Sequence, residues 1–153
     1  MPTSESAVCA VCVSLVALLS GCASIAPSPV TGQASQASVT ALSCAFPGNC
    51  VSSVGGNGVG PLTFSGTSIQ AMATLRTTLA AFPEARITRA EPLELEAIFT
   101  TPLGFQDKVD FRIDPDAHRI DYRSRSMFGL FDFGKNRARM RAVAARFEGE
   151  GGR

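Results

Sequence analysis

The chain has 153 residues, enough for one domain and a tail, and 45% of them are hydrophobic. Much of that hydrophobic content lies in the first 22 residues, which we do not expect to join the fold. The formal net charge of +1 selects no class of partner, but the charges are unevenly placed. Residues 84–118 carry eight acids and four bases, whereas residues 119–141 carry seven bases and two acids. This split is typical either of an anion site or of neighbouring strands whose charges pair.

An apolar run of thirteen residues, 7–19, is too short to cross a bilayer comfortably and has the length of a signal-peptide core. It ends in LSGC at residues 19–22, which resembles the lipobox of bacterial lipoproteins. The resemblance implies a lipoprotein signal peptide at residues 1–21 and acylation of Cys22. The leader MPTSES lacks the usual Lys or Arg, and an ordinary cleaved signal with a chance cysteine is the alternative.

Acylation of Cys22 would attach the chain to a membrane. Each buried methylene contributes about 0.8 kcal/mol, so the two or three acyl chains that the resemblance implies, palmitate among them, anchor stably. Ala23 follows the cysteine, and in Gram-negative lipoproteins this implies sorting to the outer membrane. Residues 23–43 carry no charge. We therefore expect residues 22–43 to form a lipidated, flexible tether that spans roughly 25 Å at the periplasmic face of the outer membrane.

Two cysteines remain after the leader and the lipobox, Cys44 and Cys50. Export permits a disulfide between them, which would close a short loop around a Pro-Gly turn. A metal or redox pair is the alternative. The spacing does not favour it, because it is not CxxC and no second pair of ligands exists.

Residues 50–66 are rich in glycine and predict a loop at the edge of the domain. The GGNGVG stretch is not a phosphate loop, because no Lys-Ser/Thr follows it. A helix is predicted from a cap at Thr67 or Ser68 to about Phe82, ahead of Pro83. Five apolar residues at helical spacing predict its buried stripe: Ile69, Met72, Leu75, Leu79 and Phe82.

Four segments predict strands: residues 85–90, 93–99, 108–114 and 119–126. The last two form a hairpin whose register follows from the turn at 115–118 and from alternating charge. In this register three opposite-charge pairs face each other on the outer side: Asp114 and Arg119, Arg112 and Asp121, Asp110 and Arg123. The inner pairs are Ile113 and Ile120, Phe111 and Tyr122, Val109 and Ser124. Lys108 then faces Arg125, which is left without an acidic partner.

A last helix is predicted from residues 132–136 to about Glu148, and residues 149–153 are expected to be a disordered tail. Its apolar stripe is Met140, Val143, Ala144 and Phe147. Asn136 falls within that stripe, so it must be hydrogen-bonded, and Arg137 falls on its shoulder. The wheel places three arginines away from the sheet: Arg139, Arg141 and Arg146.

Polar side chains from the end of the hairpin and the start of the last helix are expected to converge: Asp107, Ser124, Arg125, Ser126, Asp132, Asn136 and Arg137. They could hold a small anion through the two arginines and the free N–H groups of the helix. The alternative is a buried polar network that locks the turn at residues 128–133.

Catalytic arrangements are not evident. His118 is the only histidine and lies in the hairpin turn at the opposite end, so no Ser-His-Asp or Cys-His arrangement exists. No cluster has the spacing of metal ligands, and we predict no metal and no cofactor. Export excludes nucleic acid as a partner. The remaining partners are the membrane, an envelope protein or a small anionic ligand.

Three segments carry a family resemblance: NCVSS at 49–53, LGFQD at 103–107 and IDYRSRS…FDFGKNRARM at 120–140. The last approaches the pattern RSxSRxGxxDxGxNRxR, to which Asn136, Arg137 and Arg139 conform. The chain thus resembles the domain of unknown function 1499 (DUF 1499) family. Met127 stands where Arg is usual and Lys108 where a second Asp is common. The resemblance implies a globular domain at residues 44–148 and brings no established activity.

The expected fold is α+β, an antiparallel sheet of about four strands with two helices on one face. The expected function is that of a lipid-anchored, non-catalytic envelope protein with a small polar or partner-binding site. A small metal-independent hydrolase or transferase that uses Asp107 or Asp132 of the same pocket is the alternative.

Overall fold

The computed structural model describes residues 42–151. The predicted signal peptide at 1–21, the predicted acylation site Cys22, nearly all of the predicted tether and the last two residues of the predicted tail lie outside these residues. Between residues 42 and 151, neither helix has the length and apolar character required to span a membrane.

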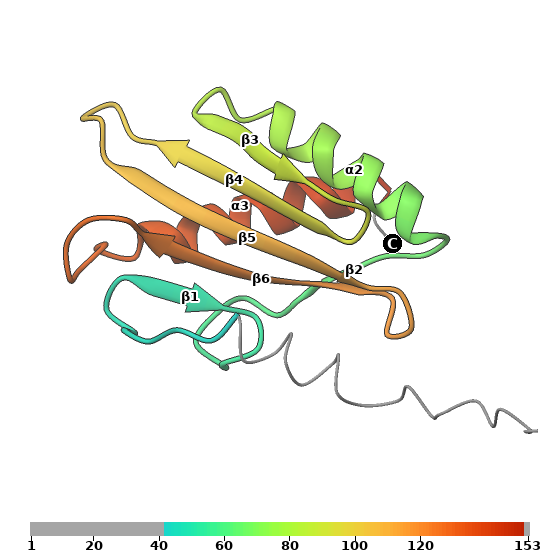
Figure 1. Cartoon of the computed structure of the whole chain (residues 1–153), viewed down its shortest axis with the longest axis horizontal. Helices are drawn as coiled ribbons and strands as arrows, with labels where there is room; N and C mark the ends of the chain where they lie inside the picture. Colours follow the sequence, from blue (N-terminus) through green and yellow to red (C-terminus); the bar gives the residue numbers. More distant parts are fainter. Residues whose placement is uncertain (1–41, 152–153) are drawn as a thin grey trace, which may run out of the picture. The chain divides into compact units, whose positions relative to one another are not determined.

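The described region is α+β, with two helices and an antiparallel sheet of six strands instead of about four (Figure 1). The strand order is β1-β6-β5-β4-β3, and the short β2 pairs with β6 beyond β1. In chain order the elements are β1 (Cys50–Ser52), β2 (Leu62–Thr63), α2 (Ser68–Ala80), β3 (Ala85–Ala90), β4 (Glu94–Thr100), β5 (Gln106–Asp114), β6 (Arg119–Ser126) and α3 (Lys135–Gly149).

The two additional strands come from the stretch that we predicted as loop. β1 and β2 pair with one edge of β6, with Cys50 opposite Arg125 and Leu62 opposite Ile120. Strands of three and two residues are too short to show an alternating pattern, and they form only because a long neighbour offers its hydrogen-bonding edge. A disulfide joins Cys50 to Cys44 just ahead of β1, with 5.7 Å between the two Cα atoms.

The register of the β5–β6 hairpin is the predicted one, from Asp114 opposite Arg119 to Asp107 opposite Ser126. One predicted ion pair is different. Arg112 pairs with Glu94 on β4, at 3.0 Å, and not with the opposite residue Asp121. Long side chains on a sheet reach diagonal and next-strand partners as easily as the facing one, so the register alone does not fix the ion pair.

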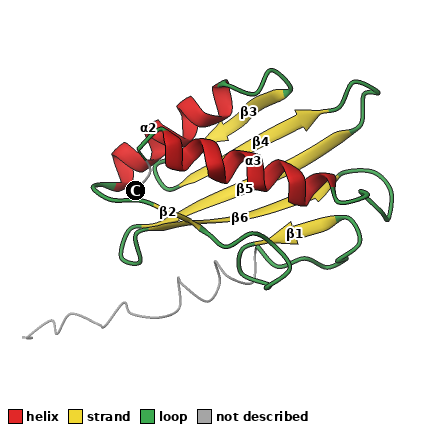
Figure 2. Ribbon diagram, turned by 180° about the vertical axis from the view of Figure 1, so that it is seen from behind, coloured by secondary structure: helices red, strands yellow, loops and turns green. Residues whose placement is uncertain are grey.

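The two helices are seen in front of the sheet in Figure 2. α2 has Thr67 as N-cap, whose hydroxyl accepts from the Gln70 N–H, while Gln70 Oε1 accepts from the Thr67 N–H. Ile69 was predicted to be core but is 80% exposed, because it lies in the first turn; Ala71 is buried in its place. α3 buries Asn136, Met140, Val143 and Phe147.

The end of α3 lies slightly beyond the predicted position. Gly149 is still helical, and the Glu150 N–H donates to the Arg146 carbonyl at 3.0 Å. The Glu150 carboxylate also pairs with Arg146 at 2.9 Å and accepts from Thr78 of α2 at 3.2 Å. Gly149 and Glu150, which we assigned to the tail, therefore belong to the helix end and to its contact with α2.

Candidate functional site

Asn136, in the first turn of α3, is fully buried and uses all of its side-chain hydrogen-bonding capacity. Its Oδ1 accepts from Ser124 Oγ at 2.6 Å and from Arg139 Nη1 at 2.8 Å. Its Nδ2 donates to the Asn49 carbonyl and to Ser126 Oγ, each at 3.1 Å. An amide side chain has two donor hydrogens and two acceptor lone pairs, so Asn136 has nothing left to offer a ligand.

The same contacts close a ring of four side chains, which we call the polar ring: Asn136, Ser126, Asp107 and Arg139. Ser126 Oγ donates to Asp107 Oδ1 at 2.6 Å, and Arg139 Nη2 donates to Asp107 Oδ2 at 2.5 Å. The side chains of Asp107 and Arg139 are only 5% and 10% exposed. The Arg139 guanidinium also lies 4.8 Å from the centre of the Phe99 ring. A buried ion pair with this many partners has its desolvation cost offset by its own hydrogen bonds.

Alternation along the strands places the polar ring at one end of the apolar core. On β5, Asp107 lies on the same face as the buried Val109, and on β6 Ser124 and Ser126 continue the inner face that holds Tyr122. α3 begins over these polar positions of the sheet, so Asn136 in its first turn contacts hydroxyl groups. Met140, one turn later, packs in the apolar core.

Asp132 occupies the helix N-terminus that an anion would need. Its Oδ2 accepts from the Asn136 N–H at 2.8 Å and its Oδ1 from the Gly134 N–H at 3.0 Å. Gly134, the N-cap residue of α3, has a φ of 78°, which places it in the left-handed region that glycine adopts without strain. The carboxylate of Asp132 thus satisfies the first N–H groups of α3 and its charge opposes the positive end of the helix dipole.

Arg137 reaches the glycine-rich segment between β1 and β2. Its guanidinium donates to the Gly58 carbonyl at 3.3 Å and, more closely, to the Asn57 carbonyl. The Asn57 side chain in turn accepts from the Ser52 N–H and donates to the Cys50 carbonyl, each at 3.1 Å. Arg137 therefore ties α3 to β1 through this segment, and does not point into the polar ring.

Arg125, like Arg137, lies outside the polar ring, which corrects the expected cluster. Successive residues of a strand point to opposite faces, so Arg125 lies on the sheet face away from Ser124, Ser126 and α3. It faces Cys50 on one side and Lys108 on the other. Its Nε is buried and has no hydrogen-bond partner. An anion site shared by Arg125 and Arg137 is therefore not formed.

Arg139 is the residue of the ring that the helical wheel missed, because we placed it on the outer side of α3. It lies on the flank of the buried stripe, three residues after Asn136, where a long side chain can reach inward over the neighbouring turn. Two signals could have found it. Asp107 faces inward and needs a cation, and Arg139 matches the NRxR part of the family pattern.

Tyr122 links the core to the same glycine-rich segment. Its hydroxyl donates to the Val59 carbonyl and accepts from the Val59 N–H at 2.8 Å. Burial raises the pKa of Tyr122 above its usual value, against the smaller opposing effects of the Val59 hydrogen bond and the Arg137 charge.

On the outer face of the sheet, the pKa of Glu96 is lowered. The main cause is a hydrogen bond from Lys108, and Thr88 is a second donor.

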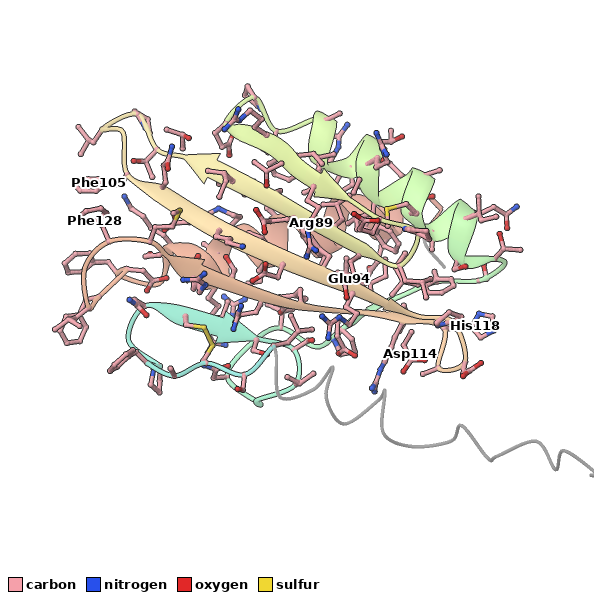
Figure 3. All side chains as sticks on the ribbon, in the orientation of Figure 1. Arg89, Glu94, Phe105, Asp114, His118 and Phe128 are labelled. Carbon is pink, nitrogen blue, oxygen red and sulfur yellow. A yellow bond between two sulfur atoms is a disulfide. The ribbon has the colours of Figure 1, made fainter. Side chains whose placement is uncertain are left out.

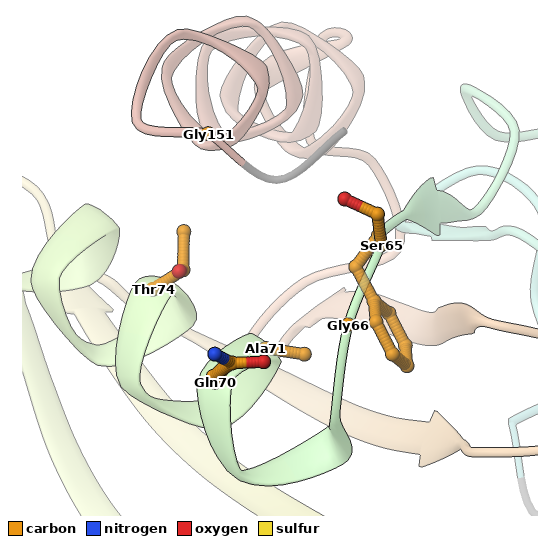
Figure 4. A pocket seen from close by; sticks show the side chains of 7 residues that line it. Ser65, Gly66, Gln70, Ala71, Thr74 and Gly151 are labelled. Atoms are coloured by element: carbon orange, nitrogen blue, oxygen red, sulfur yellow. The ribbon is translucent and has the colours of Figure 1, made fainter.

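A pocket lies elsewhere, beside the first half of α2 (Figure 4). It has a volume of about 320 Å³ and is lined by uncharged residues: Phe64, Ser65, Gly66, Gln70, Ala71, Thr74 and Gly151. None of the predicted site residues lines it. Over residues 42–151, the side chains of His, Cys, Asp and Glu form no group of three or more that could hold a metal ion.

These features define a small α+β domain whose last helix is fixed to the sheet by a filled polar network. The family model described as "Protein of unknown function (DUF1499)" matches residues 42–147, and the chain belongs to this family. The match includes every residue of the polar ring, as well as Asp132 and Arg137. No curated protein and no solved structure matched the chain.

Proposed function

We propose that this protein is a lipid-anchored component of the bacterial cell envelope that acts by binding and not by catalysis. The LSGC motif at the end of an apolar run and the uncharged stretch at 23–43 support the anchor, with Cys22 as the acylated residue and the periplasmic face of the outer membrane as its place. The disulfide between Cys44 and Cys50 is consistent with an oxidising compartment such as the periplasm.

The closed polar ring is the observation that supports binding, and not catalysis, as the role of this protein. A general base needs a lone pair directed at its substrate. Both oxygens of Asp107 accept hydrogen bonds within the protein, from Ser126 and Arg139, and the residue is 4% exposed. Both oxygens of Asp132 accept from backbone N–H groups of α3. The alternative, a hydrolase or transferase, would have to expose the buried Asp107 or use Asp132 while its carboxylate also holds the start of α3.

The anchor is tested by growing cells with labelled palmitate and comparing the wild-type chain with Cys22→Ala. The proposal expects label in the wild-type protein and none in the variant, with the folded domain retained in both. The domain's stability serves as the internal control, because Cys22 lies outside residues 42–151. Wild-type protein that carries no label, or that is recovered in the soluble fraction, would contradict the proposed function.

A further inference from the structure

Exposed apolar side chains gather on three loops, which we call the apolar loops: residues 44–49, 101–105 and 127–134. Of the ten large hydrophobic side chains exposed within residues 42–151, eight lie on these loops, between 49% and 92% exposed: Phe46, Leu103, Phe105, Met127, Phe128, Leu130, Phe131 and Phe133. An exposed apolar surface of this kind on a folded domain marks a contact with a partner or a membrane.

The apolar loops form one end of the domain. The turn between β4 and β5 and the loop between β6 and α3 lie at the same end of the sheet in Figures 1 and 2, and Figure 3 shows Phe105 beside Phe128. The Met127 N–H donates to the Gln106 carbonyl at 3.0 Å, which joins these two loops. The disulfide loop joins them through the Asn49 side chain, which donates to the Gly129 carbonyl at 2.6 Å.

The stability of the folded domain does not explain why these apolar side chains are exposed. Phe133 is 92% exposed and has a φ of 53°, a left-handed conformation that is unfavourable for an aromatic residue. Asparagine or glycine would adopt this backbone with less strain, and neither would expose a phenyl ring to water. Strain at an exposed aromatic residue, next to four other exposed apolar residues of the same loop, indicates that the loop has a role outside the folded domain.

The chemistry of the loops favours lipid over protein as the occupant. The apolar loops contain one charged side chain, Asp132, which is engaged at the start of α3. They contain no Trp, Tyr or Arg, the residues most enriched among the hot spots of protein interfaces. Two cations flank them in the sequence, the exposed Lys135 and the partly buried Arg125. Apolar side chains bordered by cations are suited to the acyl and phosphate layers of an anionic bilayer.

We propose that the apolar loops insert into the interface of the membrane that holds the lipid anchor, with Arg125 and Lys135 at the level of the lipid phosphates. This inference rests on the proposed function, because the anchor keeps the domain at a bilayer. The tether predicted from the sequence after Cys22 would span roughly 25 Å, which would keep the loops within reach of the surface. The insertion would fix the orientation of a domain that the tether alone leaves free.

The absence of tryptophan from the sequence allows a single reporter to be placed. The test compares Phe128→Trp with Ile69→Trp in the full acylated chain, in vesicles of phosphatidylcholine and phosphatidylglycerol with or without brominated acyl chains. The two positions are matched, 82% and 80% exposed, but Ile69 lies at the start of α2, away from the apolar loops. We expect a blue-shifted emission for Phe128→Trp, quenched by the brominated chains roughly twofold more strongly than that of Ile69→Trp.

Equal quenching of the two reporters would overturn the proposal. A blue shift at Phe128→Trp without quenching would also overturn it, because the loop would then be buried against protein, such as a second copy of the chain. Mass spectrometry of the same samples reports acylation separately. An unacylated chain defeats the proposed function, whereas an acylated chain without quenching defeats only the insertion.

A second variant tests the role of the strained residue. Phe133→Asn, added to Phe128→Trp, is expected to raise the urea midpoint of unfolding and to lower the quenching by brominated chains. Unchanged quenching would overturn the assignment of Phe133 to the inserted surface. Replacing phosphatidylglycerol with the zwitterionic phosphatidylcholine should weaken quenching, because Arg125 and Lys135 would then meet headgroups without net negative charge. Equal quenching in both lipids would overturn the role of these two cations in the insertion.

Discussion

Arg139 of α3 donates to Asp107 of β5 at 2.5 Å, and neither side chain is more than 10% exposed. The pair joins the last helix to the beginning of the central strand β5. Each partner also bonds another member of the polar ring, Arg139 to Asn136 and Asp107 to Ser126. Removing one of the two charges leaves the other buried in the protein without a partner, which is destabilising. Removing both charges leaves no unpaired charge.

A double-mutant cycle on this pair should therefore be strongly non-additive. We expect Arg139→Met and Asp107→Leu each to lower the free energy of unfolding by about 3 kcal/mol, and the double variant to lose clearly less than the sum. Urea unfolding of the four proteins measures the coupling. Additive losses would mean that the two side chains do not depend on each other in the folded domain.

In the glycine-rich segment between β1 and β2, we expect Gly58 to tolerate a larger side chain poorly. A Cβ atom at Gly58 would lie 2.3 Å from the Ser52 carbonyl oxygen and 2.9 Å from the Tyr122 hydroxyl. Gly58→Ala should push the segment away from β1 and β6, and lower the free energy of unfolding by roughly 1–3 kcal/mol. Gly60→Ala is the matched control, since nothing lies within 4 Å of its Cβ position. Similar urea midpoints for the two variants would be inconsistent with this close packing.

Tyr122 should make the domain's stability depend on alkaline pH. Burial raises its pKa in the folded protein above the ordinary value of 10.0, so the unfolded chain releases the proton first. The stabilisation is present in full below pH 10.0 and is lost as the pH rises through the folded-state pKa. The chain has one tyrosine, so tyrosinate absorbance follows this group alone. Tyr122→Phe should remove the alkaline dependence; a wild-type titration at the ordinary pKa would contradict the burial effect.

The sequence predicted the register of the β5–β6 hairpin because three constraints agree there: a polar turn, an apolar alternation and charges that match across the strands. It did not predict β1 and β2, because two or three residues carry no period and depend on the exposed edge of β6. The candidate cluster was recovered in part. Asp107, Ser124, Ser126 and Asn136 meet, but a helical wheel cannot show that a flanking Arg139 turns inward. The position of Arg125 could have been predicted, because alternation along β6 places it on the face opposite Ser124 and Ser126.

The most direct test of the account is the free energy of unfolding of Asn136→Ala, compared with Arg141→Ala on the exposed side of α3. We expect a loss of about 2–4 kcal/mol for Asn136→Ala, because Ser124, Ser126, Arg139 and the Asn49 carbonyl all lose a buried partner. Arg141→Ala should change the value by less than about 0.5 kcal/mol. If Asn136→Ala keeps its stability but abolishes the protein's role in the envelope, Asn136 belongs to a binding or catalytic site and the account of a structural ring is contradicted.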